Sequence, residues 1–340
     1  MTITRLATLA HGGALGALVP ACDLDIPDLN DPGLDSLQDH PTQFSIASAC
    51  TGLLIGGRRD RAAENGYVDV LGILGREAYN FDTADPRYIS ELLVGKLSPG
   101  SNFGASFWTL PYANIRLANV VLDALDKVPS ADLSDARKAA IRGFAHTIQA
   151  FDLLEVIVTH DTNGAVIATD QPIVQPPGVQ PLGDIVDRPT TYAAIIALLD
   201  GALPDLDAAS ATLDAFPFEM STGYHSPDPA LTLDTPRGFR KVNRAIRARV
   251  AAYLGDYAGV LSALGESFLD DSATADLDHG VYFVYSNKTG DVTNALINQN
   301  IYAHPLLEAE AQTTPDGMPD ARYTRKVSTA LNSDVSPQSL

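Results

Sequence analysis

Two helical patterns joined by Gly255-Asp256 form the clearest local unit of this chain and predict a pair of packed helices. The first pattern begins at Pro236 and repeats apolar residues at three- and four-residue steps, which places these on one face: Phe239, Val242, Ile246, Val250 and Tyr253. Gly255 suits the left-handed position that follows a helix, and Asp256 suits the N-cap of the next helix. Val260, Leu261 and Leu264 are then expected to face inward, so the unit is a helical hairpin.

Other segments repeat the same periodicity, and the chain is therefore expected to be mostly α-helical. These helices are predicted over Thr42–Arg59, Tyr67–Glu77, Trp108–Lys127, Asp135–Glu155 and Tyr192–Leu199. In the first of them the apolar face holds Phe44, Ala47, Cys50 and Leu54, which makes Cys50 a buried thiol. Ser134 is the predicted N-cap of the helix that starts at Asp135.

The remaining segments indicate long irregular loops and a few short strands. Strands are expected at Val156–Val158, Ala165–Ile167 and Val281–Tyr285. The segment Tyr79–Gly104, broken by prolines and glycines, is expected to be a long loop, and such loops are often functional. The hairpin at Gly255 is similar to one tetratricopeptide pair, but no strict repeat of that period occurs elsewhere. The predicted fold class is mostly α, with tetratricopeptide-like helix pairs, long irregular loops and a few short strands.

The acidity of the chain excludes two classes of binding protein. Its 340 residues carry a formal net charge of -19, whereas nucleic-acid binding and adhesion to anionic lipid both need clustered cations. Cations do gather on one helix, at Arg237, Arg240, Lys241, Arg244, Arg247 and Arg249. They form either a ligand-binding face or a solvated face that pairs with the excess carboxylates, and the composition favours the pairing. The two cysteines exclude a disulfide scaffold.

Residues 1–21 predict a signal peptide for export. Arg5 precedes a short apolar stretch, too short for the roughly 20 residues that a membrane helix needs. The next residues, Val19-Pro20-Ala21-Cys22, resemble a bacterial lipobox, in which Cys22 becomes the lipidated first residue of the mature chain. The alternative is a buried N-terminal helix that ends at Pro20. Residues 22–41 are expected to form a lipidated acidic tether, and residues 42–340 form the helical domain.

Catalytic and metal-binding motifs are absent from the sequence. It contains no zinc-protease motif, phosphate-binding loop or nucleophile elbow. His160 and Asp161 are adjacent, but adjacency in sequence does not place a catalytic base against a carboxylate that orients it. A calcium site is conceivable at Asp270, Asp271, Asp276, Asp278 and Gly280, but the EF-hand pattern is not met. We therefore expect no catalytic residue, no metal and no cofactor.

A group of aromatic residues is the candidate ligand-binding surface. The predicted binding residues are Tyr79, Phe81, Tyr88 and Phe103, with Phe107 beside them. Flat rings held at a surface stack on sugar rings or enclose other organic ligands. The alternative is that this loop folds into a small core of its own.

Several segments together resemble the SusD/RagB family of nutrient-binding outer-membrane lipoproteins. The resemblance lies in Cys22 with its acidic tether, Leu74-Gly75-Arg76-Glu77-Ala78-Tyr79, Trp108-x-x-x-Tyr112-x-x-Ile115-x-x-Ala118-Asn119, the helix pair around Gly255, and Asp320-Ala321-Arg322-Tyr323. Family members usually continue beyond the point that corresponds to Leu340, so the chain is expected to lack the family's C-terminal part.

The resemblance implies a protein that sits on a TonB-dependent (SusC-like) outer-membrane channel, captures a glycan or other oligomeric nutrient, and delivers it without bond cleavage. It implies a lipid anchor in the outer membrane, facing the cell surface. Two alternatives remain open: an envelope interaction scaffold without a small ligand, and a secreted glycan hydrolase. The family's ligand residues vary, so none is carried over to this chain.

Overall fold

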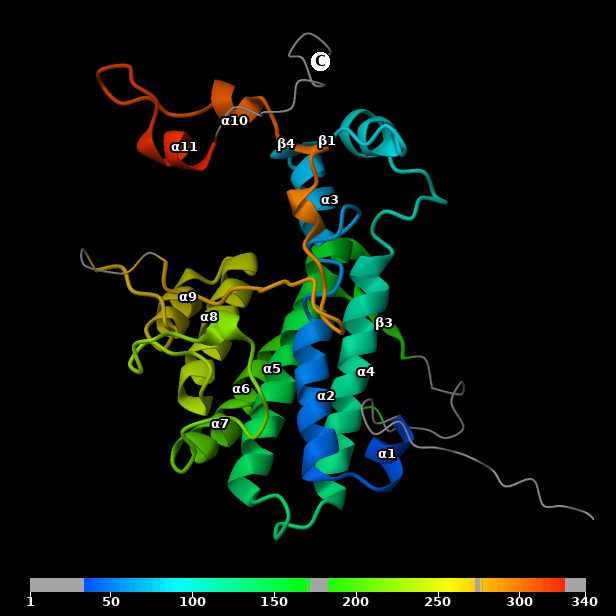
Figure 1. Cartoon of the computed structure of the whole chain (residues 1–340), viewed down its shortest axis with the longest axis vertical. Helices are drawn as coiled ribbons and strands as arrows, with labels where there is room; N and C mark the ends of the chain where they lie inside the picture. Colours follow the sequence, from blue (N-terminus) through cyan, green and yellow to red (C-terminus); the bar gives the residue numbers. More distant parts are fainter. Residues whose placement is uncertain (1–33, 170, 172–182, 273–275, 277, 328–340) are drawn as a thin grey trace, which may run out of the picture.

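Most of the chain is α-helical (Figure 1) in the computed structural model, which describes residues 34–169, 171, 183–272, 276 and 278–327. The prediction of a mostly helical fold with a few short strands is confirmed. The predicted signal peptide of residues 1–21 and the predicted lipidation site Cys22 lie outside the described residues. Within the described part, no helix is long and apolar enough to cross a membrane.

Three long helices form the centre of the molecule: α2 (Gln43–Gly56), α4 (Ser106–Lys127) and α5 (Asp135–His160). Helix α2 begins at a capping box, in which the side chains of Thr42 and Ser45 each accept a hydrogen bond from the other's backbone N–H. Helix α5 begins at the predicted N-cap Ser134, whose hydroxyl accepts from the N–H of Arg137. Local capping thus sets where both helices start.

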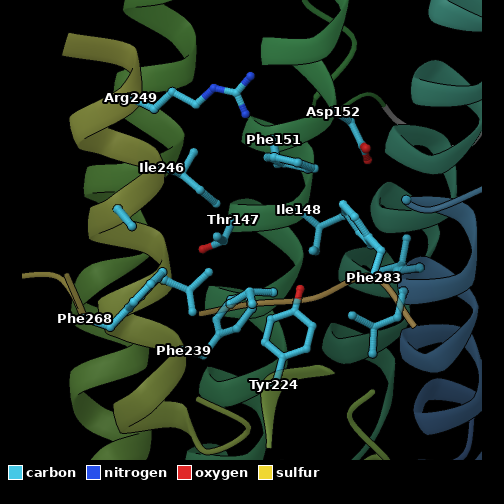
Figure 2. A pocket seen from close by; sticks show the side chains of 16 residues that line it. Thr147, Ile148, Phe151, Asp152, Tyr224, Phe239, Ile246, Arg249, Phe268 and Phe283 are labelled. Carbon is cyan, nitrogen blue, oxygen red and sulfur yellow. The ribbon is translucent and has the colours of Figure 1, made fainter. Parts of the chain in front are cut away.

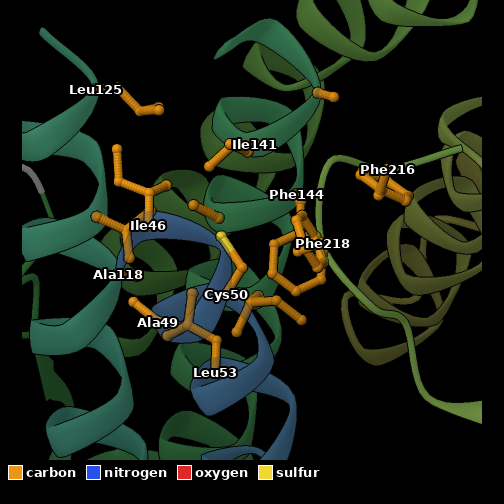
Figure 3. Close-up of a cluster of buried hydrophobic side chains, with 14 of the residues drawn as sticks. Ile46, Ala49, Cys50, Leu53, Ala118, Leu125, Ile141, Phe144, Phe216 and Phe218 are labelled. Carbon is orange, nitrogen blue, oxygen red and sulfur yellow. The ribbon is translucent and has the colours of Figure 1, made fainter. Parts of the chain in front are cut away.

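The main core lies where α2 packs against α4 and α5 (Figure 3). Ile46, Cys50 and Leu53 have no exposed surface, which confirms the buried thiol. On α5, the Phe144 ring packs against two rings from a later loop, Phe216 and Phe218. The predicted place of Phe44 on the apolar face was wrong, because it is 74% exposed and the buried stripe runs one step further round the helix.

Two helix pairs flank α5: α6 (Arg188–Gly201) with α7 (Leu203–Ser210), and α8 (Pro236–Tyr253) with α9 (Tyr257–Leu264). The predicted joint of the second pair is confirmed, since Gly255 has a φ of 71° and the Asp256 side chain caps α9 through the N–H of Gly259. The inward orientation of Leu261 was wrong, because it is 73% exposed. Helix α9 packs chiefly against α8, and that contact covers only the side that carries Ala263.

Short antiparallel ribbons join parts of the chain that are far apart in sequence. Strand β1 (Ala78–Asn80) pairs with β4 (Ile301–Ala303), and β2 (Ala165–Val166) pairs with β3 (Ile185–Val186). The ribbon β1–β4 lies at one end of the molecule, next to α3 (Tyr67–Leu74) and the π-helical segment η1 (Tyr88–Val94). Beyond it lie α10 (Leu306–Ala309) and α11 (Ala321–Lys326) (Figure 1). The short helical turns are η2 (Asp161–Asn163), η3 (Thr222–Tyr224) and η4 (Ala295–Ile297).

Three predicted segments differ from the structure. Val156–Val158 continues α5 instead of forming a strand, because Val156 and Ile157 are buried against α6 in helical register. Val281–Tyr285 forms no strand and crosses the helices as irregular chain, with the Tyr282 N–H bonded to the carbonyl of Gly223. The expected long loop Tyr79–Gly104 instead contains most of β1 and the whole of η1.

The last part of the expected tether is ordered. Residues 34–39 form the helix α1 (Leu34–Asp39), where Leu37 is 5% exposed and belongs to the main core. The Lys127 ammonium at the end of α4 donates to the carbonyl of Gln38 at 2.7 Å. The prediction of an extended tether was therefore wrong for residues 34–39, because Leu37 packs in the main core.

Candidate functional site

An open cleft lies between the turn from α3 to β1, helix α10 and helix α11, elements that Figure 1 shows at one end of the molecule. Its volume is about 760 Å³, within the roughly 300–1,000 Å³ that is usual for ligand sites. The lining residues are Gly75, Arg76, Glu77, Leu306, Leu307, Glu310, Ala311, Gln312, Asp320, Arg322, Tyr323, Lys326 and Val327. Two segments of the sequence more than 200 residues apart thus form one concave surface.

The charges that line this cleft balance. Three cations, Arg76, Arg322 and Lys326, face three carboxylates, Glu77, Glu310 and Asp320. The Arg322 guanidinium pairs with Asp320 at 2.8 Å, and this contact holds the pKa of the Asp320 carboxyl down at about 2. Walls with both signs of charge and no excess of either favour a polar ligand that is itself uncharged.

Backbone strain marks the edge of the cleft. Arg76 has a φ of 58°, in the left-handed region that residues with a side chain seldom occupy. The turn is held because the Arg76 N–H donates to the carbonyl of Ile73 at 3.1 Å and the His304 N–H donates to that of Glu77 at 2.9 Å. Such strain costs about 1–3 kcal/mol for a residue, and within the described chain Asp60 and Asp161 share it at other turns.

The ribbon beside the cleft carries two of the four predicted aromatic residues on one face. The Tyr79 ring stacks on Phe81 at 5.2 Å between centroids and on His304 at 4.4 Å, and Phe81 meets the edge of Tyr302 at 5.9 Å. Because residues alternate along a strand, Asn80 points the other way, into the core, where its amide donates to Asp69 at 2.9 Å. Tyr79 and Phe81 remain half-buried, so part of each ring is exposed to solvent.

Two polar atoms of this aromatic cluster lack partners. The Tyr302 hydroxyl and Nε2 of His304 are buried and have no hydrogen bond within the described residues. Burial and the nearby Arg76 charge lower the pKa of His304, so its imidazole is neutral at pH 7, with Nδ1 accepting from the Leu306 N–H at 3.1 Å. Buried polar atoms without a hydrogen bond are rare, and a bound molecule or a local rearrangement would supply the missing partner.

The other two predicted aromatic residues are packing residues. Tyr88 and Phe103 are 4% and 6% exposed, and they belong to a small core with Val70, Ile73 and Phe107. Their rings lie 5.1 Å apart. For Tyr88 and Phe103 the prediction of a ligand surface was therefore wrong, because η1 folds this part of the chain onto α3. Ligand binding by Tyr79 and Phe81 stays a prediction.

A second, separate cavity lies between α2, α5 and α8 (Figure 2). Its volume is about 260 Å³, and its walls are mainly aromatic and aliphatic. The lining residues are Leu53, Leu54, Gly57, Thr147, Ile148, Phe151, Asp152, Tyr224, Phe239, Val242, Ala245, Ile246, Arg249, Phe268, Val281 and Phe283. The apolar stripe of α8 that the sequence identified thus lines a cavity as well as packing on the core.

The irregular chain over residues 281–283 closes one side of this cavity. The Tyr282 N–H donates to the carbonyl of Gly223 at 3.0 Å, which ties the chain to η3. A Cβ on Gly223 would lie 1.8 Å from the carbonyl oxygen of Tyr282, so only glycine permits this approach. The contact holds Val281 and Phe283 against the cavity.

One wall of the cavity carries a buried acid, Asp152. It is 1% exposed, and its carboxyl accepts from the Asn114 amide at 2.7 Å. Burial raises the pKa of Asp152 to about 8, against the weaker opposing effects of Asn114 and Arg61. The side chain is therefore mostly protonated and neutral at pH 7. The sequence offered one signal for this acid: it follows Phe151 on a helix whose buried side is mainly apolar.

Arg249 lines this cavity, and a second guanidinium group, Arg61, lies beside it. Arg61 pairs with Glu155 and rests on the rings of Phe151 and Phe283, at 4.7 and 5.2 Å from their centroids. Arg249 is exposed, and its guanidinium donates to the Tyr253 hydroxyl at 3.1 Å. Burial raises the pKa of Glu155, while the charges of Arg61 and Arg249 act in the opposite direction.

The remaining cations of α8 largely pair with carboxylates, as the composition favoured. Arg240 bonds Asp207 and Glu266, and Arg244 bonds Asp200 at 2.8 Å. His160 and Asp161 do not act on each other: the imidazole lies against its own helix carbonyl and Asp161 pairs with Arg188. In the part of the chain that is described, no three His, Cys, Asp or Glu side chains are grouped as metal ligands.

Comparison with known proteins gave no relative: no protein-family model, curated protein or solved structure matches the chain.

Proposed function

We propose that this chain is a nutrient-binding lipoprotein of the bacterial outer membrane, similar to the SusD/RagB family, that holds a neutral oligomer such as a glycan and passes it to a TonB-dependent channel. The observation that carries the proposal is the open cleft beside the aromatic ribbon. Its size, its balanced charges and the neighbouring half-buried rings of Tyr79 and Phe81 are the chemistry that binds sugars: stacking on ring faces and hydrogen bonds to hydroxyls.

Two of the segments that resemble the family contribute residues to the cleft, which supports the proposal. Arg76-Glu77-Ala78-Tyr79 forms the edge of the cleft and the first strand of the ribbon, and Asp320-Ala321-Arg322-Tyr323 forms the opposite wall. The Trp108 segment has a structural role instead. Its Tyr112 hydroxyl bonds both backbone groups of Val166, and its Asn119 amide donates to the carbonyl of Ala168 at 2.8 Å.

Titration calorimetry with neutral oligosaccharides tests the binding site. In a panel of maltoheptaose, cellopentaose and xylohexaose we expect one to bind, and Phe81→Ala to weaken it about fivefold, because an aromatic stacking contact contributes roughly 0.5–1.5 kcal/mol. Phe44→Ala is the matched control, since Phe44 is 74% exposed on α2 and belongs neither to the aromatic cluster of the ribbon nor to the cleft. An equal effect of both variants, or the absence of any binding, would contradict glycan capture at this site.

Membrane fractionation tests the anchor. Cys22→Ala should release the chain from membranes without changing its circular dichroism, because the anchoring energy comes from acyl chains at about 0.8 kcal/mol for each buried methylene. Unchanged retention would contradict lipidation at Cys22. Purification of the lipidated protein together with a large outer-membrane channel supports delivery, whereas channel binding without any ligand favours an interaction scaffold. Hydrolysis of the bound glycan would identify an enzyme instead.

A further inference from the structure

We propose that the cavity between α2, α5 and α8 is a second binding site, which takes an amphipathic monocarboxylate with its apolar body inside the cavity and its carboxylate at Arg249. The site is separate from the cleft at the β1–β4 ribbon, and no lining residue is shared between them. Its ligand class follows from two features, the mainly apolar wall and the unbalanced charge at one end.

The wall of the cavity favours an apolar ligand body. Besides its aliphatic and aromatic residues it holds the Thr147 hydroxyl, which is already satisfied: it donates to the carbonyl of Gly143 at 2.8 Å and accepts from the Asn243 amide at 2.9 Å. A sugar placed here would lose hydrogen bonds to water and find few replacements in the cavity, which disfavours its binding. An alkyl or aryl group loses nothing and removes its own surface from water.

The charges at the other end of the cavity select an anion. Two guanidinium groups, Arg61 and Arg249, lie near one carboxylate, Glu155, so one positive charge remains uncompensated. The fourth ionisable group there is Asp152, which is neutral because it holds its proton at pH 7. In a chain with a net charge of -19, a positive charge beside an apolar cavity is complementary to a ligand with one negative charge.

Arg249 is the group placed to receive the carboxylate. Figure 2 shows its guanidinium at the end of the cavity where Asp152 also lies, with Tyr224, Phe239 and Phe268 at the opposite end. Arg61 forms an ion pair with Glu155 and lies over the Phe151 ring. In contrast, no carboxylate of the described residues lies within ion-pairing distance of Arg249. A guanidinium presents a planar fork of donors that fits both oxygens of a carboxylate.

Three probes with the same ten-carbon chain test the proposal: decanoate, 1-decanol and decylamine. Binding is measured by calorimetry on the full chain in a Cys22→Ala background, so that no detergent competes for the cavity. We expect decanoate to bind more tightly than decanol and decylamine not to bind. Arg249→Gln should weaken decanoate binding about tenfold, which corresponds to about 1.4 kcal/mol, because the charge-assisted hydrogen bonds are lost, and should leave decanol binding unchanged.

Two further variants assign the site. Ala245→Trp should abolish binding of decanoate and decanol alike, because Ala245 lines the cavity and the larger side chain would fill it. Arg237→Gln, an exposed position on the same helix away from the cavity, should change neither. Equal affinity for all three probes, no binding of decanoate, or equal losses in Arg249→Gln and Arg237→Gln would each overturn the proposal. None of these outcomes bears on oligosaccharide binding at the ribbon or on membrane anchoring.

Discussion

Asp152→Asn should make the protein more stable at neutral pH, although it alters a fully buried residue of the central helix. The folded chain keeps a proton on Asp152 up to a pKa of about 8, whereas the unfolded chain releases it near 3.8. Between these values the folded state binds more protons, so the wild type loses stability as pH rises from about 4 to 8. Asparagine cannot ionise, and its side-chain oxygen can still accept from the Asn114 amide.

The size of the effect follows from the same values. The ordinary Asp pKa of 3.8 lies about three units below pH 7, and each unit corresponds to about 1.4 kcal/mol of free energy. The stability that the variant gains at pH 7 therefore has an upper bound of about 4 kcal/mol. Relaxation and water penetration at a buried site lower this, so we expect a gain of about 2 kcal/mol in the free energy of unfolding at pH 7. The gain should vanish near pH 4 and reach its plateau above pH 8.

Urea unfolding followed by circular dichroism, at several pH values from 4 to 9, measures this difference directly. Asp291→Asn is the matched control with the opposite sign. The pKa of Asp291 is lowered to about 2, mainly by the Ser286 and Arg58 side chains, so its contribution to stability exists above pH 4 and is lost as pH falls. Asp291→Asn should therefore destabilise the protein at pH 7. A stability difference for Asp152→Asn that does not change with pH, or a loss at pH 7, would refute the protonation argument.

Three further predictions concern the core, the cavity wall and ligand binding. Phe144→Ala should lower the free energy of unfolding by about 3–5 kcal/mol in the same urea assay, because its ring has no exposed surface and contacts three other phenylalanines. Gly223→Ala should detach residues 281–283 and increase hydrogen exchange at the Tyr282 amide, since its Cβ would overlap the Tyr282 carbonyl; unchanged protection would contradict this. Decanoate affinity should fall above pH 8 in the wild type, as Asp152 ionises among Glu155, Arg61 and Arg249, and should stay constant in Asp152→Asn; parallel pH profiles would contradict this.

Local signals in the sequence were enough to locate most helices. The joint at Gly255-Asp256 and the N-cap Ser134 were predicted because capping involves residues only a few positions apart. The strand at Val156–Val158 was wrong for the converse reason: β-branched residues favour strands on their own, but here they continue a helix of 26 residues whose packing overrides that preference.

The candidate sites depend on contacts that no local pattern contains. The cleft joins Arg76 to Arg322, and the aromatic cluster joins Tyr79 to Tyr302 and His304, more than 200 residues later. Alternation over Ile301–His304 was a possible signal for β4, but it is too short to distinguish a strand from a loop. The four predicted aromatic residues form two separate groups, because Tyr88 and Phe103 are buried in the small core of η1 and α3, whereas Tyr79 and Phe81 lie on the ribbon.

A buried acid that lowers stability at neutral pH needs a reason to be present, and its surroundings offer two. Asp152 bonds Asn114, which also donates to the carbonyl of Leu53, so the acid contributes to a polar contact between α2, α4 and α5 where Gly56 allows close approach. Asp152 also lies on the wall of the cavity whose charge we assign to ligand binding.

The two reasons make different predictions for Asp152→Asn. If the contact alone matters, the variant is more stable and binds decanoate as the wild type does at every pH, because the amide preserves the bond to Asn114. If the acid tunes the cavity, the variant is more stable at pH 7 but loses the fall in affinity above pH 8. Stability and affinity measured on one variant across the same pH range therefore separate a structural role from a binding role.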